Sequence, residues 1–383
     1  MKEARPTLWD ALPRSFDRLD RYLGRLFWSS YFVTFLFFFG FFMVLEFLNL
    51  ADDLVEVTEE QGLPQRQVVE MVLAYYLYQA PNIFLQVSPF VTVIASIVML
   101  ARMKKNNEIV PILTSGRSVF RMMRPVFVFA ATLMTLQILV QECLSPEVAG
   151  RRMVLRRFLS KGESTIAIDQ PVPDQQGNQW LQLDYHPVHE RIVSGQWMRM
   201  EDERLLVATL DHLRYEKSAG GWTREDGQPI AITAHRISSA ADSRDEEGGA
   251  LRVEERMVIS SSLEPDDILM YAKEPFDLSF RELANLYGRS QIKRHLVLLH
   301  YHVTFPLSNL LLILLTAPFV LRFEKQSVLQ GLAIAFFFCG AYYAADFTMQ
   351  NLGDSTLHPV LAAWISPIFF GALGISMFDG IRS

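Results

Sequence analysis

The chain has 383 residues, half of which are apolar, and 28 of them are phenylalanine, a content that suits helices facing lipid. Its net charge of −6 says little about partners, because the charges are segregated along the chain. Basic residues cluster beside apolar runs and not on a polar domain, which argues against nucleic-acid binding. The two cysteines exclude a disulfide framework and are too few for a zinc site.

Six runs without Lys, Arg, Asp or Glu predict membrane spans, because a helix needs about 20 apolar residues to cross the hydrocarbon core. They cover residues 26–45, 71–101, 125–141, 296–321, 326–345 and 355–378. The second run exceeds this length, and its first part carries three tyrosines that suit the membrane interface. The polar start of the chain does not resemble a cleavable signal, so we expect the first span to be retained.

The charges between these runs predict one topology. Basic residues recur at every second connection: Lys2, Arg5, Arg14, Arg18, Arg21 and Arg25 in the tail, six more between residues 102 and 124, then Arg322, Lys325 and Arg382. The first connection, residues 46–70, is instead acidic. Because short basic loops stay in the cytoplasm, we expect both termini there and the insert of residues 145–294 outside.

The basic connection 102–124 predicts a short helix of its own over about residues 106–116. Asn106 or Asn107 can cap it, Glu108 suits its positive end, and Gly116 can stop it. Pro111 falls in the first turn, where it removes at most one backbone hydrogen bond. An apolar ridge follows from Ile109, Val110, Ile112 and Leu113. Such a helix is typical of a surface that a soluble partner grips.

The insert predicts an antiparallel all-β domain of the sandwich or jellyroll type, because short alternating segments follow one another without helices between them. The strand candidates are residues 180–185, 191–197, 204–216, 229–237 and 251–259, with turn clusters at 174–178, 217–221 and 242–249. Residues 151–158 and 280–291 are expected to be helical. The predicted organisation is therefore a polar segment 1–25, spans in 26–144, a β domain 145–294 and spans in 295–383.

Four ionisable residues at the outer ends of spans are candidates for contact with a substrate: Glu46, His300, His302 and Asp346. Acids at such depths are often functional, although they can also simply reach water. The histidines could donate to phosphate when charged. Asp184, His186, His189 and Glu190 have no standard metal-ligand spacing. Ser308 and Ser366 lie beside helix prolines but without a protease motif, so we expect neither metal binding nor catalysis.

Several segments together resemble the LptF/LptG permease family, which extracts lipopolysaccharide from the inner membrane. They are Leu19-Asp20-Arg21-Tyr22-Leu23, the stretch from Leu100 through Asn107-Glu108-Ile109-Val110 to Thr114-Ser115-Gly116, Phe305-Pro306-Leu307-Ser308, His358-Pro359 and Trp364-Ile365-Ser366-Pro367. Each motif alone is weak, but they occur in the family's order over nearly the whole chain. The Leu-Asp-Arg-Tyr opening favours LptG slightly over LptF.

The resemblance implies a half-transporter in the inner membrane that pairs with a homologous subunit and with a separate ATPase dimer, LptB. The chain has no G-x-x-x-x-G-K-[ST] motif, so we expect ATP and Mg²⁺ on that partner and no cofactor here. The residues expected to couple to the ATPase are Asn107, Glu108, Ile109, Val110, Leu113, Ser115, Gly116 and Arg117. In the family a glutamate at the position of Glu108 pairs with an ATPase arginine. The β domain would hand the lipid to a periplasmic bridge that begins with LptC.

One departure leaves alternatives open. Related permeases tend to carry basic residues near the outer end of the first span, whereas this chain has Glu46, Asp52 and Asp53. The cations could come from the partner subunit, the head group could differ, or a divalent cation could bridge. The chain could also be a permease for another envelope lipid or lipoprotein, or a membrane protein whose β domain binds a partner without transport.

Overall fold

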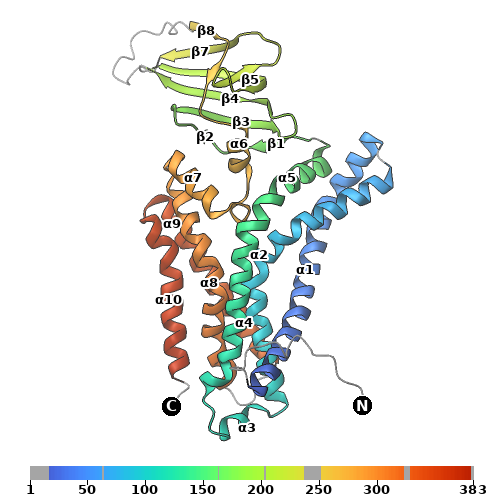
Figure 1. Ribbon diagram of the computed structural model, residues 1–383, viewed down its shortest axis with the longest axis vertical. Coiled ribbons are helices and arrows are strands. Elements are labelled where there is room, and N and C mark those ends of the chain that lie inside the picture. The colour runs from blue at the N-terminus through green and yellow to red at the C-terminus, as the bar shows by residue number, and fades with distance from the viewer. Residues whose placement is uncertain are drawn as a thin grey trace. The chain divides into compact units, whose positions relative to one another are not determined.

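The computed structural model describes residues 17–62, 64–162, 164–201, 204–236, 252–322 and 328–380. The basic residues Lys2, Arg5, Arg14, Lys325 and Arg382 and the turn cluster 242–249 lie outside these ranges. Within them, six helices are long and apolar enough to cross a membrane, which confirms the predicted number of spans. They are built from α1 (Arg18–Gln61), α2 (Gln65–Lys105), α4 (Val119–Leu139), α8 (Lys293–Arg322), α9 (Val328–Ser355) and α10 (Pro359–Asp379) (Figure 1).

The third span does not end with its apolar run. α4 continues through a π-helical stretch, η2 (Val140–Leu144), into α5 (Ser145–Lys161).

Contacts divide the chain into two compact units. Unit 1 comprises residues 1–45, 81–142 and 296–383, and unit 2 comprises residues 46–80 and 143–295.

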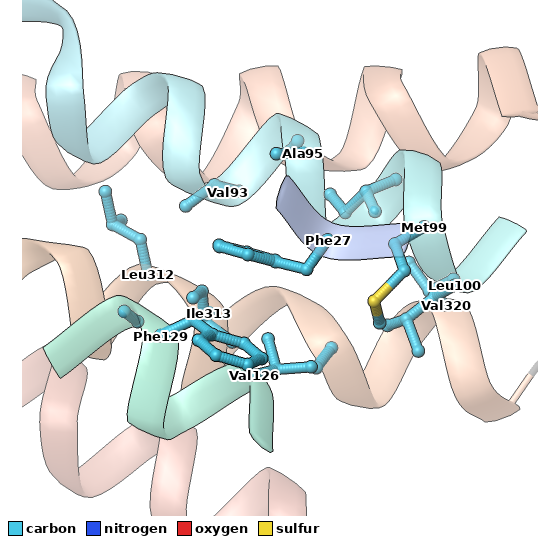
Figure 2. Close-up of a cluster of buried hydrophobic side chains, with 14 of the residues drawn as sticks. Phe27, Val93, Ala95, Met99, Leu100, Val126, Phe129, Leu312, Ile313 and Val320 are labelled. Atoms are coloured by element: carbon cyan, nitrogen blue, oxygen red, sulfur yellow. The ribbon is translucent and has the colours of Figure 1, made fainter. Parts of the chain in front are cut away.

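The core of unit 1 is a large apolar cluster from the spans. Phe27 stacks on Phe129 with ring centroids 5.7 Å apart, and Leu312 and Ile313 of α8 are fully buried in the same cluster (Figure 2). Small residues allow close helix contacts, since a Cβ added at Gly353 of α9 would collide with the side chains of Ala362 and Val297. The apolar runs thus serve both as lipid-facing surface and as core.

The acidic connection 46–70, expected as a loop, is mostly helical, and this expectation was wrong. α1 runs on to Gln61, and α2 begins at Gln65. The reason is visible in the spacing of Leu50, Leu54 and Val57, which are buried at helical intervals while most of the acids are exposed. These leucines pack with Tyr75 of α2 and Leu159 of α5 in a second apolar cluster, inside unit 2.

The rest of unit 2 contains one antiparallel sheet of nine strands, which confirms the inserted β domain. The strands are β1 (Ile166–Ile168), β2 (Val172–Pro173), β3 (Asn178–His186), β4 (Arg191–Glu201), β5 (Arg204–Glu216), β6 (Gly221–Arg224), β7 (Ile230–Arg236), β8 (Arg252–Arg256) and β9 (Ile259–Ser260) (Figure 1). β3, β4 and β5 form a meander at its centre. β5 pairs with β7 through its first half and with β6 through its second, so the sheet divides there.

The buried face of this sheet is built on three tryptophans. Trp180 pairs with Trp197 across β3 and β4, and Trp222 of β6 contacts Trp180 edge-on with centroids 6.2 Å apart. Gly221 lies so close to the backbone of Ile259 that a Cβ there would overlap its carbonyl oxygen. Glycine therefore starts β6 at a place where the sequence indicated only a turn.

Three short helices complete unit 2: α6 (Pro265–Ala272), the 3₁₀ turn η3 (Pro275–Asp277) and α7 (Phe280–Ser290). α7 begins with a capping box, in which the Ser279 side chain accepts from the Glu282 amide and Glu282 accepts from the Ser279 amide. The remaining helix, α3 (Ile109–Thr114), lies between α2 and α4 and is described next.

Candidate functional site

α3 is a six-residue helix held between two left-handed residues. Asn107 has φ +56° and lies two residues after the end of α2, and Gly116 has φ +82° and follows the last turn of α3. The Gly116 amide donates to the Leu113 carbonyl at 3.0 Å, so this glycine stops the helix as expected. Pro111 lies in the first turn. The helix is shorter than the predicted 106–116, because residues 106–108 are used to turn the chain out of α2.

The expected cap was wrong. Glu108, not an asparagine, occupies the N-cap position, and its side chain makes no capping hydrogen bond. Asn106 instead donates from Nδ2 to Oε1 of Glu108 at 3.0 Å. The hydroxyl of Tyr22, at the start of α1, donates to Oε2 at 2.8 Å. The half-buried Glu108 carboxylate therefore accepts hydrogen bonds from two neutral donors of the same chain.

The apolar residues of α3 face in two directions. Ile109 is only 9% exposed and belongs to the core of unit 1, and Ile112 packs against the same cluster. Val110 is 63% exposed and Leu113 is 37% exposed. Ile109 and Ile112 thus fix the helix to the spans, whereas Val110 and Leu113 present apolar surface beside the Glu108 carboxylate.

The basic residues around α3 are partly engaged within the chain. Arg117 and Arg121 approach Oδ2 of Asp17 at 3.5 and 3.0 Å. Lys104 donates to the Val320 carbonyl at 3.0 Å, near the C-terminal end of α8, where the helix dipole favours a cation. The hydroxyl of Ser115 donates to the Ile112 carbonyl at 2.7 Å. These contacts hold the segment on the ends of the spans.

The four candidates for substrate contact are divided between the two units. Glu46 belongs to unit 2, where it accepts from the Tyr75 hydroxyl at 2.6 Å and lies 3.8 Å from Arg156. His300, His302 and Asp346 belong to unit 1. Each has neighbours within its own unit.

Two of these residues are deeply buried. His302 is 7% exposed, with Nδ1 at 2.9 Å from Nε2 of Gln141 and Nε2 at 3.0 Å from Oε1 of Glu142. Asp346 is 2% exposed and accepts from Gln350 at 3.1 Å. His300 is half-buried and accepts at Nδ1 from Trp364 at 3.4 Å. His302 is thus occupied by groups of its own unit, while His300 is more open.

Among the metal-ligand candidates, Asp184 accepts from Arg157 at 2.7 Å and from Ser194 at 3.0 Å. His186 and His189 stack with ring centroids 4.6 Å apart. The pKa of His186 is lowered, first by burial and then by the nearby His189 and Arg191. The lowered pKa keeps the ring neutral at pH 7. In the residues that the structure describes, no three ligand-type side chains gather closely enough to hold a metal ion.

The sequence did not reveal a polar network inside unit 1. Nδ2 of Asn309 donates to Oε1 of Gln137 at 2.6 Å, and its Oδ1 accepts from Thr92 at 2.9 Å. Gln137 donates onward to the Leu85 carbonyl at 2.9 Å. These neutral residues join α2, α4 and α8, and a search for charges in apolar runs overlooks them. Polar side chains within apolar spans are the signal that could have found them.

A second missed group lies in unit 2. Arg152 of α5 is 4% exposed, pairs with the buried carboxylate of Asp277, and donates to Gln79 of α2 at 2.9 Å. Ser145 also donates to Asp277 at 3.1 Å. This network links α2, α5 and η3. Arg152 is one of several basic residues in α5, and nothing in its spacing marks it as the buried one.

The fold and the site define a class: a helical, multi-span membrane protein with an inserted antiparallel β domain and a short helix displayed between its second and third spans. A family described as "Lipopolysaccharide export system permease LptF/LptG" matches residues 21–379. This match covers nearly the whole chain, and the chain belongs to the LptF/LptG family. Among curated proteins, no relative matches it.

Proposed function

We propose that this chain is the permease subunit of an ATP-driven exporter that takes lipopolysaccharide from the outer leaflet of the inner membrane. Membership of the LptF/LptG family makes it a transport subunit of lipopolysaccharide export. The observation that carries the coupling proposal is α3, which is anchored by Ile109 and displays Val110 and Leu113 beside Glu108. An exposed apolar pair next to a carboxylate suits a groove with an apolar floor and an arginine at its edge.

The proposed partner at α3 is an LptB-like ATPase dimer, which binds ATP and Mg²⁺. A second permease of the same family completes the membrane cavity. When ATP closes the ATPase dimer, its grooves move the α3 helix of each permease. Ile109 and Ile112 transmit that movement to the spans, because they are packed into the core of unit 1. The cavity between the two permeases then narrows and expels the lipid toward the β domain.

Removal of the lipid from the bilayer is the step that needs energy. Each CH₂ taken out of the hydrocarbon core costs about 0.8 kcal/mol, so several acyl chains make unaided desorption very slow. Coupling to hydrolysis makes the transfer directional. The β domain passes the chains to an LptC-like periplasmic bridge. Among the substrate candidates, His300 is the more open histidine and is the better placed to meet a lipid phosphate.

The topology proposed for the inner membrane puts both termini and α3 in the cytoplasm and the β domain in the periplasm. Single cysteines at Val110 and at Glu216, the last residue of β5, test it after Cys143 and Cys339 are replaced by serine. An impermeant maleimide added to spheroplasts should label position 216 only. Label at position 110 in intact spheroplasts contradicts the coupling proposal.

The function itself is tested by mixing the detergent-solubilised chain with an LptB-like ATPase and a second family member. We expect a stable complex that, in vesicles, removes lipopolysaccharide to an acceptor only when ATP is supplied. A complex that instead exports a lipoprotein or a phospholipid in the same assay would assign the chain another cargo. The slight similarity to LptG is tested by supplying either an LptF or an LptG as the second family member and measuring which of the two restores lipopolysaccharide export.

A further inference from the structure

Two residues at the start of α1, Asp17 and Tyr22, contact the chain on both sides of α3. Before α3, the Tyr22 hydroxyl donates to Oε2 of Glu108 at 2.8 Å. After α3, Oδ2 of Asp17 accepts from Arg121 at 3.0 Å and from Arg117 at 3.5 Å. All five residues belong to unit 1. We call these contacts the α1 brace, because they hold α3 at both of its ends.

The start of α1 is a fixed platform for this brace. The Asp17 amide donates to Oδ2 of Asp20 at 3.0 Å, and the Asp17 carbonyl accepts from the Arg21 amide at 3.2 Å. The first of these bonds is half of a capping box, and both acids suit the positive end of the helix dipole. Asp20 is only 2% exposed. Asp17 is therefore fixed to the first turn of α1.

The same segment carries the Leu19-Asp20-Arg21-Tyr22-Leu23 motif, and its side chains point in two directions. Leu19 and Leu23, four positions apart, pack in the core of unit 1. Tyr22 is 40% exposed and contacts Glu108 instead. The motif thus anchors one face of the helix in the core and leaves the other face for the chain around α3.

The α1 brace sets the position of α3 and adds little to the stability of the fold. Asp17 and both arginines are partly exposed, and ion pairs at such sites contribute little free energy. Their arrangement matters more than their strength. A short helix held at one end can swing about that contact, whereas a helix held at both ends moves with the element that holds it. Here that element is α1, which continues from Arg18 to Gln61 without a break.

The α1 brace also gives Arg117 a different role from the one that the family resemblance implies. The resemblance places Arg117 among the residues that couple to the ATPase. In the structure, its guanidinium and that of Arg121 approach the same oxygen of Asp17. Arg117 therefore acts on the position of α3, while Val110 and Leu113 supply the exposed apolar surface.

We propose that Asp17 and Tyr22 are positioning residues of the exporter, which couple α3 to α1 so that movement of α3 by the ATPase displaces the first span. The inference rests on the proposed function, because α3 transmits movement only when an ATPase grips it. It goes further by naming the span that receives the movement and the residues that pass it on. Neither residue has to touch the ATPase or the lipid.

The test measures ATP hydrolysis and lipopolysaccharide transfer in the same vesicles, with the complete complex and saturating LptB-like ATPase. Saturation is needed because Tyr22→Phe is also expected to weaken ATPase binding. The double variant Asp17→Asn with Tyr22→Phe should transfer about threefold to tenfold less lipid per ATP hydrolysed. Its hydrolysis rate and its unfolding midpoint should stay close to the wild-type values, whereas a merely structural defect would lower both.

Charge reversal tests the contact behind Asp17 directly. Asp17→Arg places three cations together and should lower the lipid transferred per ATP. Adding Arg117→Asp and Arg121→Asp to the same chain restores opposite charges and should recover roughly half of the wild-type ratio or more.

Glu70→Gln is the matched control. It also replaces a carboxylate by an amide in an exposed ion pair, with Arg66 at 2.9 Å, but in the unit that does not contain α3. It should leave the ratio unchanged. A wild-type ratio in the double variant, or charge reversal without recovery, overturns the positioning role while the wild-type complex still exports. A wild-type complex that does not export at all instead overturns the proposed function, and the positioning role falls with it.

Discussion

The Tyr22 hydroxyl donates a hydrogen bond of 2.8 Å to Oε2 of Glu108, which joins the start of α1 to the residue that opens α3. Asn106 holds the other carboxylate oxygen at 3.0 Å. Two neutral donors orient the carboxylate without neutralising it. A cation approaching from outside therefore meets an acceptor whose position is already fixed, which reduces the ordering cost of binding.

The first prediction concerns this carboxylate. Glu108→Gln should weaken binding of the LptB-like ATPase at least tenfold, because loss of one member of a hydrogen-bonded charge pair at an interface costs about 2–5 kcal/mol. Tyr22→Phe removes only one neutral hydrogen bond, about 0.5–1.5 kcal/mol, and should weaken binding about twofold to tenfold. Titration by fluorescence anisotropy measures both. An affinity unchanged by Glu108→Gln would contradict a coupling role for this residue.

The second prediction separates the two faces of α3. Val110→Ser and Leu113→Ser should weaken ATPase binding about tenfold each, while the free energy of unfolding changes by no more than about 0.5 kcal/mol, because both side chains are partly or largely exposed. Ile109→Ala should lower the free energy of unfolding by about 2–4 kcal/mol, because it leaves a cavity in the core of unit 1. Thermal unfolding in detergent and binding assays on the same samples distinguish the two effects. Loss of stability in the serine variants would mean that α3 is packed inward.

The third prediction is a pH dependence in unit 2. Burial raises the pKa of Asp277 to about 6, against the lowering effect of Arg152. Because the folded protein binds this proton more tightly than the unfolded chain, the group contributes most stability below pH 3.8, its ordinary pKa, and loses it as pH rises through about 6. The full change corresponds to about 3 kcal/mol.

Unfolding midpoints of the purified chain between pH 7.5 and 4 check this dependence. Asp277→Asn should flatten the profile between pH 6 and 4, while the exposed Asp52→Asn should leave it as in the wild type. An Asp277→Asn profile with the wild-type slope would mean that other groups bind the proton.

Much of the fold could be predicted because the spans and long strands carry strong patterns. β5 has the bounds predicted from its alternation, Arg204–Glu216. Ends were harder. A search for charge-free runs stops at Glu46, although Leu50, Leu54 and Val57 carry the helix further with acids on the other face.

Errors elsewhere have local causes. The segment predicted as one strand over 251–259 is two, β8 and β9, which pair with β7 and β6 respectively. β1, β2 and β6 have at most four residues, too few for alternation to be read. At the candidate site, the order of Asn106, Asn107 and Glu108 suggested a cap. Only the structure brings Tyr22, 86 positions away, to that carboxylate.

The fourth prediction concerns the neutral network in unit 1. Asn309→Leu should lower the free energy of unfolding by about 1–2 kcal/mol, because Gln137 and Thr92 then lose partners while they remain buried. The double variant with Gln137→Leu should recover part of this loss, since replacing both partners leaves fewer unsatisfied groups. Recovery separates hydrogen bonding from a general intolerance of leucine at either position. Unfolding in mixed detergent micelles gives both values, and strictly additive losses would show that the Asn309–Gln137 contact does not stabilise the spans.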